Sequence, residues 1–192
     1  MEPLSSEFGT GGIGTVTGKG LSGGFTPISA LIGRKEVIDA LEPGQQVFTF
    51  TGHPGCAVAA SSVIDHIEKH GLKDRAAKAG SLLKSHLENV RIQYPDIIVE
   101  VRGKGLMLGM EINRTSNTLA AIIFATRSVE KGVYVGYFGV QKEVVRIEPP
   151  LIIGEKEVTT IVHVLSEVAK EMHTGTIPKE TIDNVHKYSV GL

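Results

Sequence analysis

Four stretches of this chain carry apolar residues at the spacing of a helix that is buried on one face. They cover residues 54–70, 72–94, 118–130 and 155–172. Glycine or proline follows each stretch, as is typical of helix ends. The apolar positions are Ala60, Val63, Ile64 and Ile67, then Ala76, Ala79, Leu83, Leu87 and Val90, then Leu119, Ile122, Ile123 and Val129, and finally Val158, Ile161, Val162, Leu165, Val168, Ala169 and Met172. The pattern predicts four amphipathic helices.

Shorter runs rich in valine and isoleucine predict strands at 28–33, 97–101, 106–112, 133–135 and 144–147. Two glycines in residues 102–105 are typical of a hairpin connection, and residues 35–41 predict one or two helical turns. Residues 95–173 are therefore predicted to form a compact α/β unit, a small sheet with helices packed on it. The fold class is α/β.

The start of the chain is rich in glycine, with eight glycines among the sixteen residues 9–24. Gly9, Gly11 and Gly14 match the spacing of a dinucleotide-binding loop, but no apolar strand precedes them and no helical pattern follows. Glycine also has a large entropic cost of ordering. We expect residues 1–17 to be an irregular leader, or a sequence junction upstream of Thr17, rather than a nucleotide site.

Composition excludes several classes of function for this protein. The net charge of −1 and the pI of about 6.7 give no basic surface for nucleic acid or anionic membrane. The apolar stretches are too short to span a bilayer, and no basic-then-apolar leader opens the sequence. The single cysteine, Cys56, is interpreted as a small buried helix residue. His53 and His66 show no metal-ligand spacing with other histidines, cysteine or acids, so no metal site is predicted. We expect a cytoplasmic protein without nucleic-acid or membrane partners.

Lys19 is the strongest candidate for chemistry, because it lies in the glycine-rich run Gly18–Gly24. Glycines on both sides allow other groups to approach the lysine amine closely. A lysine that forms an imine with an aldehyde cofactor needs this access.

Several further blocks carry a resemblance to a known family. They are residues 18–24 (GKGLSGG) leading into 27–34 (PISALIGR), then 49–54 (TFTGHP), 101–109 (VRGKGLMLG) and 145–151 (VRIEPPL). Together and in this order they resemble class III pyridoxal-phosphate aminotransferases, the group of 4-aminobutyrate, ornithine and acetylornithine aminotransferases. The resemblance implies the C-terminal part of a fold-type I pyridoxal-phosphate-dependent transferase, with a remnant of its large domain.

The resemblance also implies a division of the chain. After the leader at 1–17, residues 18–53 correspond to the remnant of the cofactor-binding large domain and 54–94 to linking helices. Residues 95–173 correspond to the C-terminal small domain, and 174–192 to a peripheral tail. Members of the family are longer, and the parts that hold the cofactor's phosphate turn, ring face and ring nitrogen precede the matching lysine. We therefore expect a fragment that has little activity alone.

Site residues follow from the matching positions. Lys19 corresponds to the lysine that bonds covalently to pyridoxal phosphate and shuttles a proton during the reaction. Thr49 corresponds to the threonine that reaches the cofactor phosphate of the neighbouring subunit, and Arg146 to the arginine that binds the substrate carboxylate. Arg102 and Lys104 belong to a turn that is interpreted as structural, and Glu111 and Glu148 have no partner assignable from the sequence.

Two functions remain open on these grounds. The first is a fragment of an aminotransferase, a homodimer, that moves an amino group from a 4-aminobutyrate- or ornithine-like donor to a 2-oxo acid. Aminomutase, racemase or decarboxylase chemistry on the same scaffold stays open within it. The alternative is a non-catalytic folded or dimerising module without a cofactor site.

Overall fold

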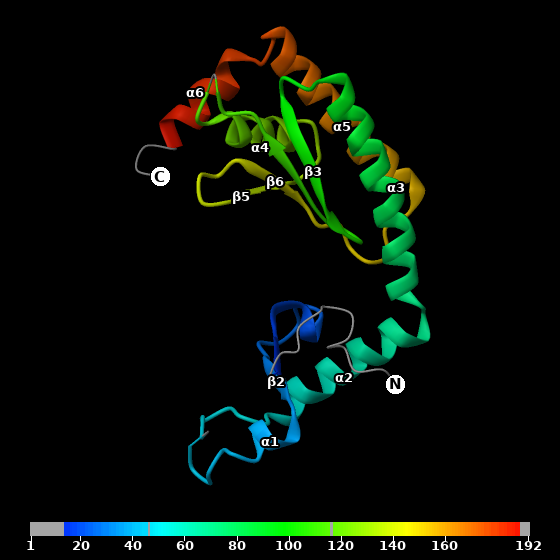
Figure 1. The fold of residues 1–192 in the computed structure, drawn as a ribbon, viewed down its shortest axis with the longest axis vertical. Coiled ribbons are helices and arrows are strands. Elements are labelled where there is room, and N and C mark those ends of the chain that lie inside the picture. Colours follow the sequence, from blue (N-terminus) through cyan, green and yellow to red (C-terminus); the bar gives the residue numbers. More distant parts are fainter. Residues whose placement is uncertain (1–13, 46, 116, 189–192) are drawn as a thin grey trace. The chain divides into compact units, whose positions relative to one another are not determined.

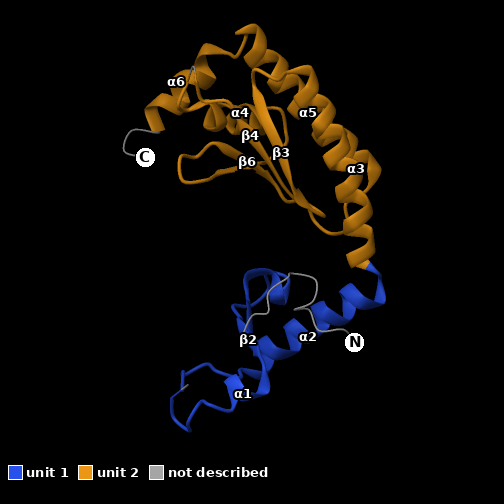
Figure 2. Ribbon diagram, in the orientation of Figure 1, with its two compact units in different colours: residues 1–71 blue, residues 72–192 orange. Residues whose placement is uncertain are grey.

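The computed structural model describes residues 14–45, 47–115 and 117–188. The chain divides into two compact units, residues 1–71 and 72–192 (Figure 2). The boundary lies between two helices that sequence reasoning had grouped as linking helices. The finer division into five segments stays a prediction.

The first unit contains a two-stranded hairpin and three helical elements (Figure 1). The elements are β1 (Gly14–Thr17), the 3-10 helix η2 (Lys19–Ser22), β2 (Ala30–Gly33), α1 (Lys35–Ile38) and α2 (Pro54–Lys69). Strands β1 and β2 pair antiparallel, with Gly14 opposite Gly33 and Thr17 opposite Ala30. Helix α2 packs on η2, where Val63 approaches Gly23.

The second unit is a four-stranded sheet covered by helices on one face (Figure 1). Its elements are α3 (Leu72–Gln93), β3 (Ile98–Lys104), β4 (Met107–Ile112), α4 (Ala120–Glu130), β5 (Gly136–Phe138), β6 (Val144–Ile147), α5 (Glu155–Thr174) and α6 (Lys179–Tyr188). All strand pairs are antiparallel, in the order β3-β4-β6-β5.

The core of the second unit lies between this sheet and helices α3, α4 and α5. Alternation in the strands places one set of side chains on the covered face, since Leu108 pairs with Ile147 and Met110 with Val145. These side chains pack against apolar residues of the helices. The fully buried members of the core include Leu83, Leu87, Leu108, Met110, Phe124, Val145, Leu165 and Val168. Burial of this one continuous apolar face holds the unit together.

The sequence predicted most of these elements, with four differences. The predicted strand at 133–135 is wrong, because the strand is Gly136–Phe138. Val133 and Val135 are buried in the core without joining the ladder. The connection predicted at 102–105 lies instead at Gly105–Leu106, and β3 continues to Lys104.

The other two differences concern the ends of the chain. Residues 14–17 form strand β1 where irregular chain was expected, because pairing with β2 supplies its backbone hydrogen bonds. Residues 1–13, with most of the glycine fingerprint, lie outside the described residues. Helix α6 was not predicted; its Val185 packs on Ile122 and Ile123 of α4. Within the described ranges, no helix is long and apolar enough to cross a membrane.

A close backbone approach fixes α3 on the sheet. A Cβ atom added at Gly80 would lie 2.1 Å from the Gly105 carbonyl oxygen and 2.2 Å from its carbon. Only glycine fits there, because the obstacle is backbone and cannot rotate away. The helix and the β3–β4 turn therefore touch directly.

We expect Gly80→Ala to lower the free energy of unfolding of the second unit by about 1–3 kcal/mol, because α3 must move away from the turn. Chemical denaturation followed by circular dichroism measures the change. Ser81→Ala, at the exposed neighbouring position of the same helix, is the matched control and should leave stability nearly unchanged. Equal stability of the two variants contradicts the close packing at Gly80.

Candidate functional site

Lys19 opens the 3-10 helix η2 in a left-handed backbone conformation. Its φ is 50°, which is uncommon for a residue with a side chain. The side chain is exposed, and its amine has no hydrogen-bond or ion-pair partner among the residues that the structure describes. The amine is therefore open to an incoming electrophile, as the flanking glycines predicted.

The turn after Lys19 is held by Ser22. The Ser22 side chain is only 2% exposed; its hydroxyl donates to the carbonyl of Thr26 and accepts a 3.1 Å hydrogen bond from the Thr26 amide. Gly23 and Gly24 between them have φ of 66° and 83°, which glycine adopts without strain. The serine thus closes the loop and fixes the chain that follows the lysine.

Thr49 lies in the turn that leads into helix α2, and its side chain is exposed. The cap residue of α2, His53, makes no side-chain hydrogen bond to the first turn, and Pro54 follows it. The amides of Gly55 and Cys56 therefore have no acceptor within the helix. An uncapped helix N-terminus is a suitable environment for an anion, and Thr49 precedes the cap residue by four positions.

Arg146 lies on the sheet face opposite the core of the second unit. It pairs with Gly109 on one side and Gly136 on the other. Because neither neighbour has a side chain, the guanidinium is not crowded within the ladder. The ring of Phe138 fills part of this space, and the guanidinium carbon lies 3.6 Å from the ring centroid. This is a cation–π contact.

Glu148 also approaches Arg146. It lies two residues further along the chain, just after the end of β6. Its Oε2 lies 2.9 Å from Arg146 Nε, yet this buried Nε makes no hydrogen bond of good geometry. The ion pair is half exposed, so its contribution to stability is small. No partner of the terminal guanidinium nitrogens is seen in the described residues. That edge of Arg146 is available for a carboxylate.

The predicted site residues fall in different units. Lys19 and Thr49 belong to residues 1–71 and Arg146 to residues 72–192, and each is described within its own unit. Sequence reasoning missed Phe138 and the Glu148 contact. Glu148 could have been found from its i, i+2 spacing to Arg146, whereas no local pattern identifies Phe138. Arg102, interpreted as structural, pairs with Glu111 at 2.7 Å.

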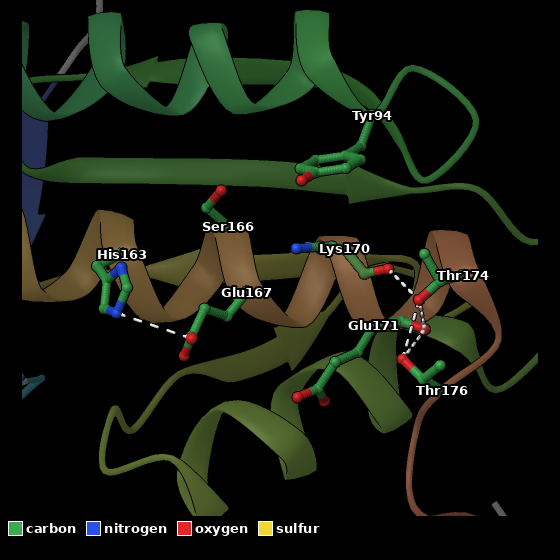
Figure 3. Close-up of a pocket in the computed structure, with 8 residues that line it drawn as sticks. All are labelled: Tyr94, His163, Ser166, Glu167, Lys170, Glu171, Thr174 and Thr176. Carbon is green, nitrogen blue, oxygen red and sulfur yellow. Dashed lines mark hydrogen bonds and ion pairs between the residues drawn. The ribbon is translucent and has the colours of Figure 1, made fainter.

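Arg146 lines neither of two cavities that described residues of the second unit form. The first, of about 450 Å³, is a polar groove along α5 that Tyr94 and Thr176 border (Figure 3). Its Glu171 is already engaged by Arg127 at 2.7 Å and Lys131 at 2.9 Å. The Arg127 hydrogen bond, more than that of Lys131, lowers the pKa of the Glu171 carboxyl. The Glu171 carboxylate is therefore neutralised by residues that lie beside the groove.

The second cavity has a volume of about 470 Å³ and lies at the start of α5. Val135, Ile147, Pro149 and Ile161 line it with mostly apolar surface. It contains no set of converging polar groups that assigns a ligand.

The second unit is an α/β fold, and comparison with known proteins identifies the family. The family model for class-III aminotransferases matches residues 13–169. This chain belongs to the class-III aminotransferases.

Individual relatives carry different names. The chain is 38% identical to acetylornithine aminotransferase 1 of Bordetella bronchiseptica and 33% identical to ornithine aminotransferase 1 of Staphylococcus saprophyticus. Each of these two matches covers 80% of the present chain. It is 34% identical to a leucine/methionine racemase of Thermococcus litoralis over 85% of the present chain. The matches span only 37% of the length of the Bordetella protein, 36% of the Staphylococcus protein and 38% of the Thermococcus protein.

Solved structures confirm the fold. Acetylornithine aminotransferase from Elizabethkingia anophelis matches 83% of this chain with a TM-score of 0.75 and 31% identity, over 41% of its own length. Ornithine delta-aminotransferase of Plasmodium falciparum matches 88% with a TM-score of 0.77 and 26% identity, over 42% of its length. The expected α/β fold of part of such a transferase is thereby confirmed.

We expect Ser22→Ala to loosen the turn that follows Lys19. Loss of the hydroxyl removes a partner of the Thr26 amide, a change of about 1 kcal/mol, so exchange of that amide should rise about fivefold. Hydrogen exchange followed by NMR measures it. Ser29→Ala, at an exposed position nearby, should leave the Thr26 amide unchanged. Unchanged exchange in both variants contradicts the role given to Ser22.

Proposed function

We propose that this chain is part of an aminotransferase that uses pyridoxal phosphate to move an amino group to a 2-oxo acid. The amino donor is 4-aminobutyrate- or ornithine-like. One observation supports this most: the exposed amine of Lys19, which has no partner in the part of the chain that the structure describes and lies between glycines in the stretch that matches the family model.

The residues present fit the cofactor in part. The open amine of Lys19 suits an aldehyde, and the Thr49 hydroxyl with the uncapped N-terminus of α2 suits a phosphate. When bound, the cofactor supplies the aldehyde that takes up the amino group and a ring that withdraws electrons. Lys19 would hold the cofactor covalently, and its amine would be placed to move a proton at the substrate carbon.

Arg146 is proposed to bind the substrate carboxylate. Its free guanidinium edge can donate two parallel hydrogen bonds to a carboxylate, a geometry that lysine does not offer. The Phe138 ring packs on one face of the guanidinium, and the Glu148 carboxylate lies beside its Nε.

The chain by itself is proposed to be a poor catalyst. It spans less than two fifths of the length of the relatives named above. Large apolar side chains of the first unit are exposed, including Phe25 at 84% and Phe50 at 80%. Such exposure is typical of a surface that other polypeptide covers. The groups that grip the cofactor ring are expected from that polypeptide, and Thr49 is expected to act in a neighbouring subunit of a homodimer.

Two other functions are weighed against this one. Racemisation of an amino acid would use the same lysine, and the similarity to the Thermococcus litoralis racemase favours it as second candidate. A non-catalytic dimerising module is the alternative if the cofactor does not bind. A cytoplasmic location remains part of the proposal.

Reduction by borohydride in the presence of pyridoxal phosphate tests the proposal, since it fixes the cofactor to the lysine that binds it. For the isolated chain we expect sparse labelling spread over surface lysines and no turnover of 4-aminobutyrate or ornithine, because partners for the cofactor ring are lacking. Peptide mapping locates the label, with Lys19→Ala and Lys35→Ala as paired variants. Stoichiometric, selective labelling of Lys19 with measurable turnover would show that the chain is catalytically sufficient.

A further inference from the structure

Two histidines lie one turn apart at the end of helix α2. His70 caps the helix, and its amide donates a 3.1 Å hydrogen bond to the His66 carbonyl. This helical bond keeps both side chains on one face. The sequence analysis found no metal-ligand spacing between His66 and another histidine; this was wrong, because His70 lies at the i, i+4 position.

The two imidazole rings are close and accessible. Their centroids are 4.3 Å apart with an interplanar angle of 44°, and both side chains are exposed. Within the described ranges, none of the nitrogens of the two rings has a hydrogen-bond or ion-pair partner. Four ring nitrogens are therefore available on one surface turn.

We propose that His66 and His70 form a two-histidine binding site for a divalent first-row transition metal. Two imidazoles bound to one metal in neighbouring positions, with metal–nitrogen bonds of about 2.0–2.1 Å, place their centroids roughly 4.5–5 Å apart. The observed centroid distance of 4.3 Å is close to this range, and both rings are exposed and can rotate.

The surroundings favour a cation. The last turn of α2 leaves carbonyl groups without amide partners, and the helix dipole is negative at this end. Imidazole ligands select Zn²⁺, Ni²⁺ and Cu²⁺ over Mg²⁺ and Ca²⁺, which prefer oxygen. No group of three metal-ligating side chains occurs in the described part of the chain, so water completes the coordination. The metal is exchangeable and differs from a closed structural site.

Calorimetric titration of the chain with Zn²⁺ tests the site, in a Cys56→Ser background that removes the thiol. We expect one Zn²⁺ per chain, removed by a chelator, and no heat from Mg²⁺. His66→Gln and His70→Gln should each weaken binding at least about tenfold. His86→Gln is the matched control, since His86 is exposed on α3 with no histidine one turn away, and should bind like the parent.

A second measurement avoids substitutions. In NMR spectra of the unsubstituted chain, Zn²⁺ should shift the ring resonances of His66 and His70 together and leave those of His86 in place. Circular dichroism checks that each variant keeps its helices, which glutamine favours. Equal Zn²⁺ affinity in the His66, His70 and His86 variants, or the absence of any paired shift, overturns the proposal.

Discussion

Burial of one face of the β3-β4-β6-β5 sheet is the constraint on which the second unit depends. Helices α3, α4 and α5 cover this face, and their apolar side chains meet Leu108, Met110, Val145 and Ile147. The direct contact of Gly80 with the β3–β4 turn sets how closely α3 lies on the sheet. Because strand side chains alternate, the same register that buries Val145 and Ile147 places Arg146 on the opposite face. The core therefore positions the candidate substrate-binding residue.

The first unit is organised differently. Of its described large apolar side chains, most are exposed, and its hairpin has only two strands, which is marginal alone in water. Local contacts shape the region around Lys19: the Ser22–Thr26 hydrogen bonds and the packing of Val63 near Gly23. These contacts are sufficient to define the turn, but they do not enclose a cofactor. We infer that the lysine is presented by local structure and that its pocket is completed by other polypeptide.

The sequence predicted elements with strong periodicity and missed those set by tertiary context. The helices at 54–70, 72–94 and 155–172 follow from repeated apolar positions. The strand at 133–135 was predicted from its valines, yet these pack into the core and the ladder begins at Gly136, where pairing opposite Arg146 decides the register. Helix α6 carries few apolar residues, and its place is fixed by contacts of Val185 with α4 that no local pattern indicates.

In the candidate site, too, some features could be predicted from the sequence and others depend on tertiary context. The glycines around Lys19 indicated an accessible amine, and the structure describes one, while its role in catalysis remains a prediction. The contact of Phe138 with Arg146 depends on the pairing of β5 with β6 and on Gly136, where a Cβ atom would lie 2.4 Å from the Phe138 ring. Such a contact arises only once the sheet has formed.

Hydrogen–deuterium exchange of the isolated chain, read by mass spectrometry, tests the central claim most directly. The account predicts strong protection of amides in α3, β3, β4 and α5, since they belong to a closed apolar core. It predicts rapid exchange in residues 14–52, where that core is lacking. Equal, strong protection of both units in the isolated chain would contradict the claim that the lysine-bearing unit needs further polypeptide.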